Sequence, residues 1–133
     1  MIIAIDFDGT CVTHDYPDVG KDIGAVPVLK ELIKNGHHLM LWTMRGNKPV
    51  DGNRNTLQDA VDWFKENNIP LWGINENPEQ TLEGWTNSKK QYAQLYIDDA
   101  ALGCPLKMDF NLSNRPFVDW SGVRTELKRM KII

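Results

Sequence analysis

Short apolar runs alternate with segments of helical periodicity along this chain, and this alternation constrains the fold more than any other feature. Residues 2–5 form a β-branched apolar run that ends at a turn, as a buried strand does. Apolar residues at helical spacing occupy 26–33, a second apolar run follows at 38–42, and a second helical pattern covers 57–64. Strands separated by helices pair in parallel through right-handed crossovers. The sequence therefore predicts an α/β fold.

The second half of the chain continues the alternation with shorter segments. We expect a third strand at 71–74, a fourth at 95–97 and a fifth within 116–120, before a C-terminal helix around 123–130. Residues 75–87 follow neither period. The whole pattern predicts a three-layer α/β/α, Rossmann-like domain with a five-stranded, mostly parallel sheet.

Length and composition set the class of protein. At 133 residues the chain is about one ordinary domain long, so we expect one domain over residues 1–133. The net charge of −3 gives no basic excess for holding nucleic acid, which we therefore expect only as a substrate. The two cysteines, Cys11 and Cys104, are too few for a disulfide scaffold and fit a reducing cytoplasm. Because no apolar run reaches membrane-spanning length and the first lacks a basic lead, we expect neither a signal peptide nor a membrane partner.

Polar side chains follow three of the expected strands at the points where these end. Asp6 and Asp8 follow the first strand, Thr43 the second, and Asp98 and Asp99 the fourth. In parallel sheets, ligands bind beyond these carboxyl ends. Four converging carboxylates repel one another unless a divalent cation neutralises them. Because hard oxygen ligands favour magnesium, which is commonly shared with a substrate phosphate, the sequence predicts a Mg²⁺ site that takes a phosphorylated substrate.

Basic residues near these strands could complete a phosphate site. Lys89 and Lys90 precede the fourth strand and could hold phosphate oxygens. Arg45, two residues beyond Thr43, lies where a substrate could be reached, although an arginine beside Gly46 is also a common solvated turn residue. His14 carries no signal from its spacing.

The segment Ile2-Ile3-Ala4-Ile5-Asp6-Phe7-Asp8-Gly9-Thr10 resembles the first signature of the haloacid dehalogenase superfamily, whose members are mostly magnesium-dependent phosphatases. It is joined, in the family's order, by an apolar strand ending in Thr43, by a lysine at Lys89 or Lys90, and by Tyr96-Ile97-Asp98-Asp99. The order of four elements carries information that no single motif holds. The resemblance spans residues 1–101 and implies a phosphomonoester hydrolase.

The resemblance also implies catalytic roles. Asp6 would attack phosphorus and form an aspartyl-phosphate that water then cleaves. Asp8 would protonate the departing alcohol and later take a proton from the attacking water. Thr43 would hydrogen-bond a phosphoryl oxygen, and Gly9 and Arg45 would join it in binding the substrate.

The remaining roles concern charge. Asp6, Asp98 and Asp99 would hold the Mg²⁺ directly or through water, and Asp8 would contribute its backbone carbonyl. Lys90, which we prefer over Lys89, would offset the charge of the nucleophile and of the bound phosphate.

The chain departs from fuller members of this superfamily because it has no room for a cap domain. The two candidate positions for an insertion, residues 11–25 and 76–87, are too short to fold alone. Such a capless protein would have an open site, suited to a small phosphorylated molecule or to a phosphate at the end of a macromolecule. Alternatively, a neighbouring subunit of a homodimer would serve as the lid.

Two other functions use similar residues. A signalling receiver domain also combines a parallel sheet, acidic residues, magnesium, a threonine and a lysine around a phosphorylated aspartate. A receiver would place its adjacent acidic pair after the first strand, whereas the pair here, Asp98-Asp99, follows the fourth. It would place its phosphorylated aspartate after the third strand, where this chain has Asn75. The second alternative is a catalytically silent scaffold of the haloacid dehalogenase fold, although the aspartates and Thr43 are all present.

Overall fold

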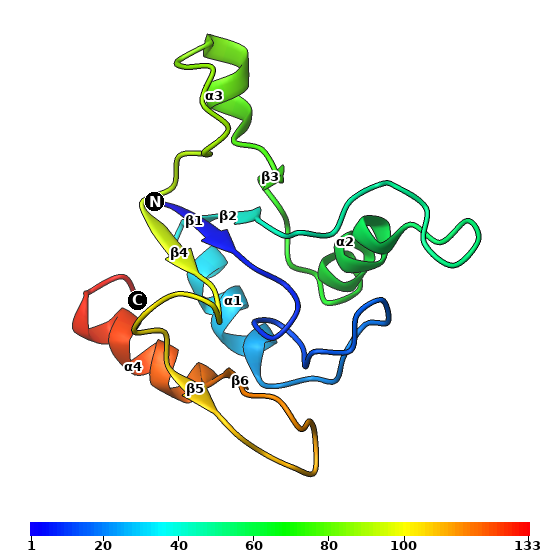
Figure 1. Ribbon diagram of the computed structural model, residues 1–133. Helices are drawn as coiled ribbons and strands as arrows, with labels where there is room; N and C mark the ends of the chain where they lie inside the picture. Colours follow the sequence, from blue (N-terminus) through cyan, green and yellow to red (C-terminus); the bar gives the residue numbers. More distant parts are fainter.

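The computed structural model describes residues 1–133 and contains short strands and helices that largely alternate (Figure 1). In chain order these are β1 (Ile2–Ile5), α1 (Ala25–Lys34), β2 (His38–Leu41), α2 (Thr56–Glu66), β3 (Gly73–Ile74), α3 (Pro78–Glu83), β4 (Leu95–Ile97), β5 (Leu106–Lys107), β6 (Phe117–Val118) and α4 (Trp120–Arg129). No helix combines the length and apolar character that a membrane crossing requires.

The main sheet is parallel and has four strands in the order β3-β2-β1-β4. In the centre of the sheet, Ile5 lies opposite Leu41 of β2 and Ile97 of β4. The carboxyl ends of the strands therefore share one edge of the sheet, as Figure 1 shows for β1 and β4. The predicted α/β class and the four predicted parallel strands are confirmed.

The predicted fifth strand forms, but it does not extend this sheet. β6 pairs antiparallel with β5 in a separate two-stranded sheet. The chain turns immediately after β4, where Ala101 N–H donates to Asp98 O, and Val118 N–H of β6 later donates to Gly9 O. β6 thus docks on the turn that follows β1 rather than beside β4. The prediction of a five-stranded sheet is corrected to four parallel strands with a separate hairpin-like pair.

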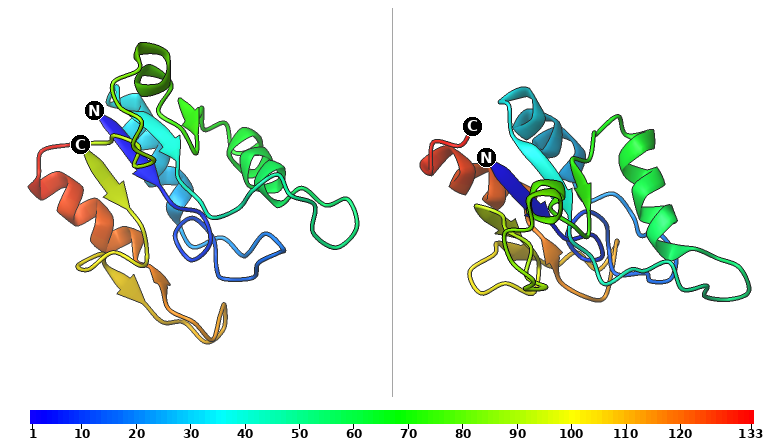
Figure 2. Two further views of the ribbon diagram at one scale, coloured as in Figure 1. Left: turned by 45° about the horizontal axis from the view of Figure 1, so that its top comes forward. Right: turned by 90° about the horizontal axis from the view of Figure 1, so that it is seen from above.

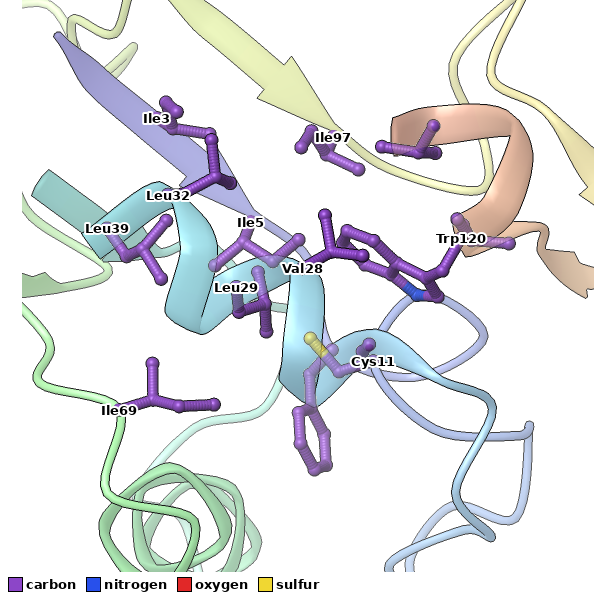
Figure 3. Close-up of a cluster of buried hydrophobic side chains, with 14 of the residues drawn as sticks. Ile3, Ile5, Cys11, Val28, Leu29, Leu32, Leu39, Ile69, Ile97 and Trp120 are labelled. Atoms are coloured by element: carbon purple, nitrogen blue, oxygen red, sulfur yellow. The ribbon is translucent and has the colours of Figure 1, made fainter. Parts of the chain in front are cut away.

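The core is built on the apolar runs that predicted the strands. Alternate residues of β1, Ile3 and Ile5, pack on the same side as the apolar face of α1, which carries Val28, Leu29 and Leu32 (Figure 3). Residues at the intervening positions, such as Ala4 and Met40, are also buried. Burial of both faces is typical of a parallel sheet and explains why the strands are apolar throughout.

A tight turn follows β1 and begins a folded loop. Phe7 O accepts hydrogen bonds from the N–H groups of Thr10 and Cys11. Gly9 has φ 79°, a left-handed conformation that favours glycine. The loop then returns on itself, since Thr13 N–H donates to Lys21 O. Burial raises the pKa of the Cys11 thiol, which donates to the carbonyl oxygen of Asp6, the residue directly after β1.

Two other connections matter for the site. Residues 42–55 lead from β2 to α2 as a long loop that extends away from the sheet (Figure 2). The segment that follows neither period contains α3, where the Asn77 side chain accepts from Gln80 N–H and Pro78 occupies the first turn.

Candidate active site

Three carboxylates meet at the carboxyl edge of the sheet. Asp6, Asp98 and Asp99 each offer an oxygen, and these oxygens lie within 4.8 Å of one another. The pairing of β1 with β4 explains this, because Ile5 lies opposite Ile97 and Asp6 N–H donates to Ile97 O at 3.0 Å. The residues that follow the two strands therefore emerge side by side. We call Asp6, Asp98 and Asp99 the acidic cluster.

Thr10 joins the two halves of the acidic cluster, although no role was predicted for it from the sequence. Its buried Oγ1 donates to Asp6 Oδ2 at 2.7 Å and accepts from Asp99 N–H at 3.0 Å. It also lies 3.3 Å from Asp99 Oδ1. One hydroxyl thus fixes the nucleophile candidate relative to β4. The available signal was its place directly after Gly9 in the first signature.

Electrostatics favour a cation at this cluster. Burial raises the pKa of Asp6 to about 7, and the charge of Asp98 and the contact with Asp99 add to this. The Thr10 hydroxyl and the Phe7 N–H act in the opposite direction. A divalent cation would relieve the repulsion, and carboxylate oxygens are the donors that Mg²⁺ prefers. The acidic cluster therefore fits such an ion.

His14 covers one side of the acidic cluster. Its Nε2 lies 2.8 Å from Asp99 Oδ2. Gly9 lies beneath both groups, because a Cβ there would come within 2.0 Å of His14 Nε2 and 2.7 Å of Asp99 Oδ2. Gly9 N–H donates to Val12 O, and Gly9 O accepts from Val118 N–H. Gly9, predicted to bind substrate, instead makes room for these side chains and uses its backbone within the fold.

Asp8 lies apart from the acidic cluster and faces Arg45. Arg45 Nε donates to Asp8 Oδ2 at 2.8 Å, and Nη2 donates to Oδ1 at 2.7 Å. Arg45 is only 2% exposed. The structure therefore does not place its guanidinium where a substrate could touch it, contrary to our prediction. Nor does the Asp8 carboxylate join the three that could hold a metal.

Thr43 lies beyond β2, at the same edge of the sheet. Its N–H donates to Asn75 Oδ1 at 2.8 Å, and its Oγ1 accepts from Arg45 N–H at 3.1 Å. Asn75, which follows β3, also donates through Nδ2 to Arg45 O at 3.2 Å. Asn75 thus ties the ends of β2 and β3 together. The sequence identified it only as a turn residue.

Lys90 precedes β4, and its side chain lies near Tyr96 of that strand. The segment from α3 to β4 reaches the sheet beside the N-terminus (Figure 1), and Gln94 N–H donates to Ile2 O there. Lys90 Nζ lies 6.0 Å from the centre of the Tyr96 ring. No ion pair joins Lys89 or Lys90 to a carboxylate of the acidic cluster.

No family model matches the chain, and no curated protein matches it. Among solved structures, one described as a conserved protein from Bacteroides thetaiotaomicron is similar over nearly the whole molecule. The two chains are 32% identical, and the similarity covers 98% of this chain and 91% of the other with a TM-score of 0.71. The α/β fold is therefore shared with that protein.

Proposed function

We propose that this chain, which belongs to the same family as the conserved protein from Bacteroides thetaiotaomicron, is a magnesium-dependent phosphomonoester hydrolase of the haloacid dehalogenase type. The observation that carries the proposal is the acidic cluster, three carboxylates with oxygens within 4.8 Å of one another. They stand at strand ends where the resemblance implies a nucleophile and metal ligands. The four-stranded parallel sheet is compatible with the three-layer, Rossmann-like arrangement that the alternation of strands and helices predicts.

Asp6 is the nucleophile in this proposal. Thr10 holds its Oδ2, which leaves Oδ1 to attack phosphorus. A bond forms between Oδ1 and phosphorus as the ester bond to the alcohol breaks, and water then cleaves the aspartyl-phosphate. Oxygens of the acidic cluster would hold Mg²⁺, which when bound offsets the negative charge of the carboxylates and the phosphate.

Asp8 and Thr43 serve the leaving group and the phosphate. Asp8, two residues beyond the nucleophile, gives a proton to the departing alcohol and later accepts one from the attacking water. The Thr43 hydroxyl, at the end of the neighbouring strand, donates to a phosphoryl oxygen. Lys90 forms no ion pair with the acidic cluster, and the role that the resemblance implies for it, offsetting the charge of the nucleophile and the phosphate, stays a prediction.

The substrate is a phosphorylated small molecule or the phosphorylated end of a macromolecule. The internal segments 11–25 and 76–87, where a cap domain would be inserted, are too short to fold alone, so few remote contacts are available to a small substrate. We propose that sharp selectivity for a small molecule would require a second subunit as the lid. A cytoplasmic location stays a prediction of the sequence.

A screen of phosphomonoesters with and without Mg²⁺ tests the proposal. The screen should include phosphorylated metabolites, short oligonucleotides phosphorylated at either end, and an aryl phosphate. We expect hydrolysis that chelation abolishes and that added Mg²⁺ restores.

The matched variants are Asp98→Asn and Asp51→Asn. The first should lose most activity, because it removes a charge from the acidic cluster. The second is a control, because Asp51 is exposed and has φ 48°, a conformation that asparagine also adopts. Equal turnover in excess chelator would show that the metal assignment is wrong.

A further inference from the structure

Arg45 is buried in a way that leaves none of its donors free. Nε and Nη2 donate to the two oxygens of Asp8, at 2.8 and 2.7 Å. Nη2 also donates to Asp18 O at 2.7 Å, and Nη1 donates to Thr56 O at 3.1 Å and Pro17 O at 3.3 Å. A guanidinium has five N–H groups. Each therefore has a partner within the protein.

Two aromatic rings hold the same guanidinium. Its central carbon lies 5.0 Å from the centre of the Phe7 ring and 5.2 Å from the centre of the Tyr16 ring. Arg45 thus connects three parts of the chain: the turn after β1, the loop around Tyr16, and the beginning of α2. Its conformation is fixed from several sides, and a fixed guanidinium imposes a fixed geometry on a carboxylate that it binds through two hydrogen bonds.

The exposure of the two partners is unequal. The Arg45 side chain is 1% exposed, whereas that of Asp8 is 20% exposed. Each carboxylate oxygen has two lone pairs, and Arg45 donates to one of them on each oxygen. The second lone pair on each oxygen is left for another donor. Asp8 is therefore held from the protein side and still reaches solvent. Buried ion pairs are often no more stabilising than apolar side chains of similar volume, so stability alone is a weak reason for this pair.

We infer that Arg45 is a positioning residue, which fixes the Asp8 carboxylate for proton transfer to the leaving group and from the attacking water. This inference rests on the proposed function. It replaces the predicted contact between Arg45 and the substrate with an action through Asp8. Its consequence is specific: loss of Arg45 should harm the reactions that need proton transfer more than those that do not.

The test compares two leaving groups in Arg45→Lys. A lysine can keep the positive charge but cannot bind both carboxylate oxygens in the same fork. An alkyl alcohol needs a proton as it departs, whereas a nitrophenolate leaves without one. We expect kcat/KM for an alkyl phosphate to fall about ten- to a hundredfold more than kcat/KM for nitrophenyl phosphate. Asp8→Asn should show the same preference, and inhibition by inorganic phosphate should be unchanged in Arg45→Lys.

Arg124→Lys is the matched control. Arg124 also binds a carboxylate through two nitrogens, Nε and Nη2 to Glu31 at 2.8 and 3.0 Å, but it joins α4 to α1. Arg124→Lys should leave kcat/KM unchanged for both the alkyl phosphate and nitrophenyl phosphate. In the double variant of Arg45→Lys with Asp8→Asn, the loss should be no greater than in Asp8→Asn, because the two residues act as one unit.

Each outcome separates the inference from the proposed function. If the wild-type protein hydrolyses no phosphomonoester, the proposed function fails. If it does, and Asp8→Asn affects the alkyl phosphate selectively while Arg45→Lys slows both substrates equally or weakens phosphate inhibition, the inference alone fails.

A measurement on the wild-type protein covers the case in which Arg45→Lys does not fold. The Arg45 Nε–H resonance should be protected from solvent exchange, and it should keep its chemical shift when Mg²⁺ and inorganic phosphate are added. A direct phosphate contact would shift it and overturn the inference.

Discussion

At the scale of single residues, Thr10 shows how one hydroxyl can organise a site. Thr10→Val keeps the shape but removes the donor to Asp6 and leaves Asp99 N–H without its partner. We expect a loss of about 1–3 kcal/mol in the free energy of unfolding, because a buried polar group loses its hydrogen bond. Turnover should also fall, whereas Thr10→Ser should keep most of both. Denaturant unfolding and phosphatase assays measure these effects; equal behaviour of the two variants would contradict this role.

Repulsion within the acidic cluster should lower the stability of the fold when no cation is bound. Asp98 contributes to the raised pKa of Asp6, so the two charges repel in the metal-free protein. Asp98→Asn removes this repulsion and can keep the hydrogen bond that Asp98 Oδ1 accepts from Ala100 N–H. In chelator, we expect a gain of about 0.5–2 kcal/mol in the free energy of unfolding. Stabilisation of the fold by added Mg²⁺ should be lost in this variant.

Urea unfolding with chelator or with Mg²⁺ measures both effects, with Asp51→Asn as the control. A destabilised Asp98→Asn protein in chelator, or one that Mg²⁺ stabilises as much as the wild type, would count against a cation at the acidic cluster.

The residues of the acidic cluster were predictable because Asp6 and the Asp98-Asp99 pair come directly after apolar runs, and parallel strands end at one edge. Thr10 and His14 were less accessible to sequence reasoning, since their contacts depend on how the loop after β1 folds back. Arg45 was a candidate for substrate contact, with a solvated turn residue as the alternative, and its burial could not be predicted from a polar, glycine-containing neighbourhood.

At the scale of structural elements, the turn after β1 depends on Gly9. Gly9→Ala would strain a backbone with φ 79° and place a Cβ 2.0 Å from His14 Nε2. Gly36→Ala is the matched control, because Gly36 has φ 85° but nothing lies within 4 Å of its added Cβ. Both substitutions should destabilise the fold through backbone strain, by about 1 kcal/mol. Gly9→Ala should cost more and also lower activity, by displacing His14 from Asp99.

Thermal unfolding and assays of both variants test this expectation. Equal destabilisation, with activity retained in Gly9→Ala, would show that the packing of His14 against the turn is unimportant.

The positions of the helices and strands in the sequence were predicted better than their arrangement in space. Periodicity identified the four parallel strands and the helices α1, α2 and α4, because burial on the sheet imposes it. The destination of β6 could not be predicted, since it depends on a hydrogen bond to Gly9 O in a distant turn. Lys90 illustrates the same limit: its order in the chain matches the family, but its position near Tyr96, without an ion pair to the acidic cluster, could not be read from that order.

At the scale of the whole molecule, one apolar core supports the sheet edge where the acidic cluster lies. A cluster of 23 buried hydrophobic residues spans β1, β2, β4, α1, α2 and α4. Asp6 follows the inner strand β1 and Asp98 follows the edge strand β4, and both strands contribute residues to this core. This arrangement favours a rigid acidic cluster.

Trapping the covalent intermediate tests the central claim most directly. Wild-type protein and Asp8→Asn, in which hydrolysis of the intermediate should be slow, are mixed with Mg²⁺ and an aryl phosphate and quenched in acid. Mass spectrometry of the intact chain and its peptides should find one phosphoryl group on Asp6, absent from Asp6→Asn. A chain that turns over substrate but carries no phosphoryl group on Asp6, or carries it on another residue, would contradict the account.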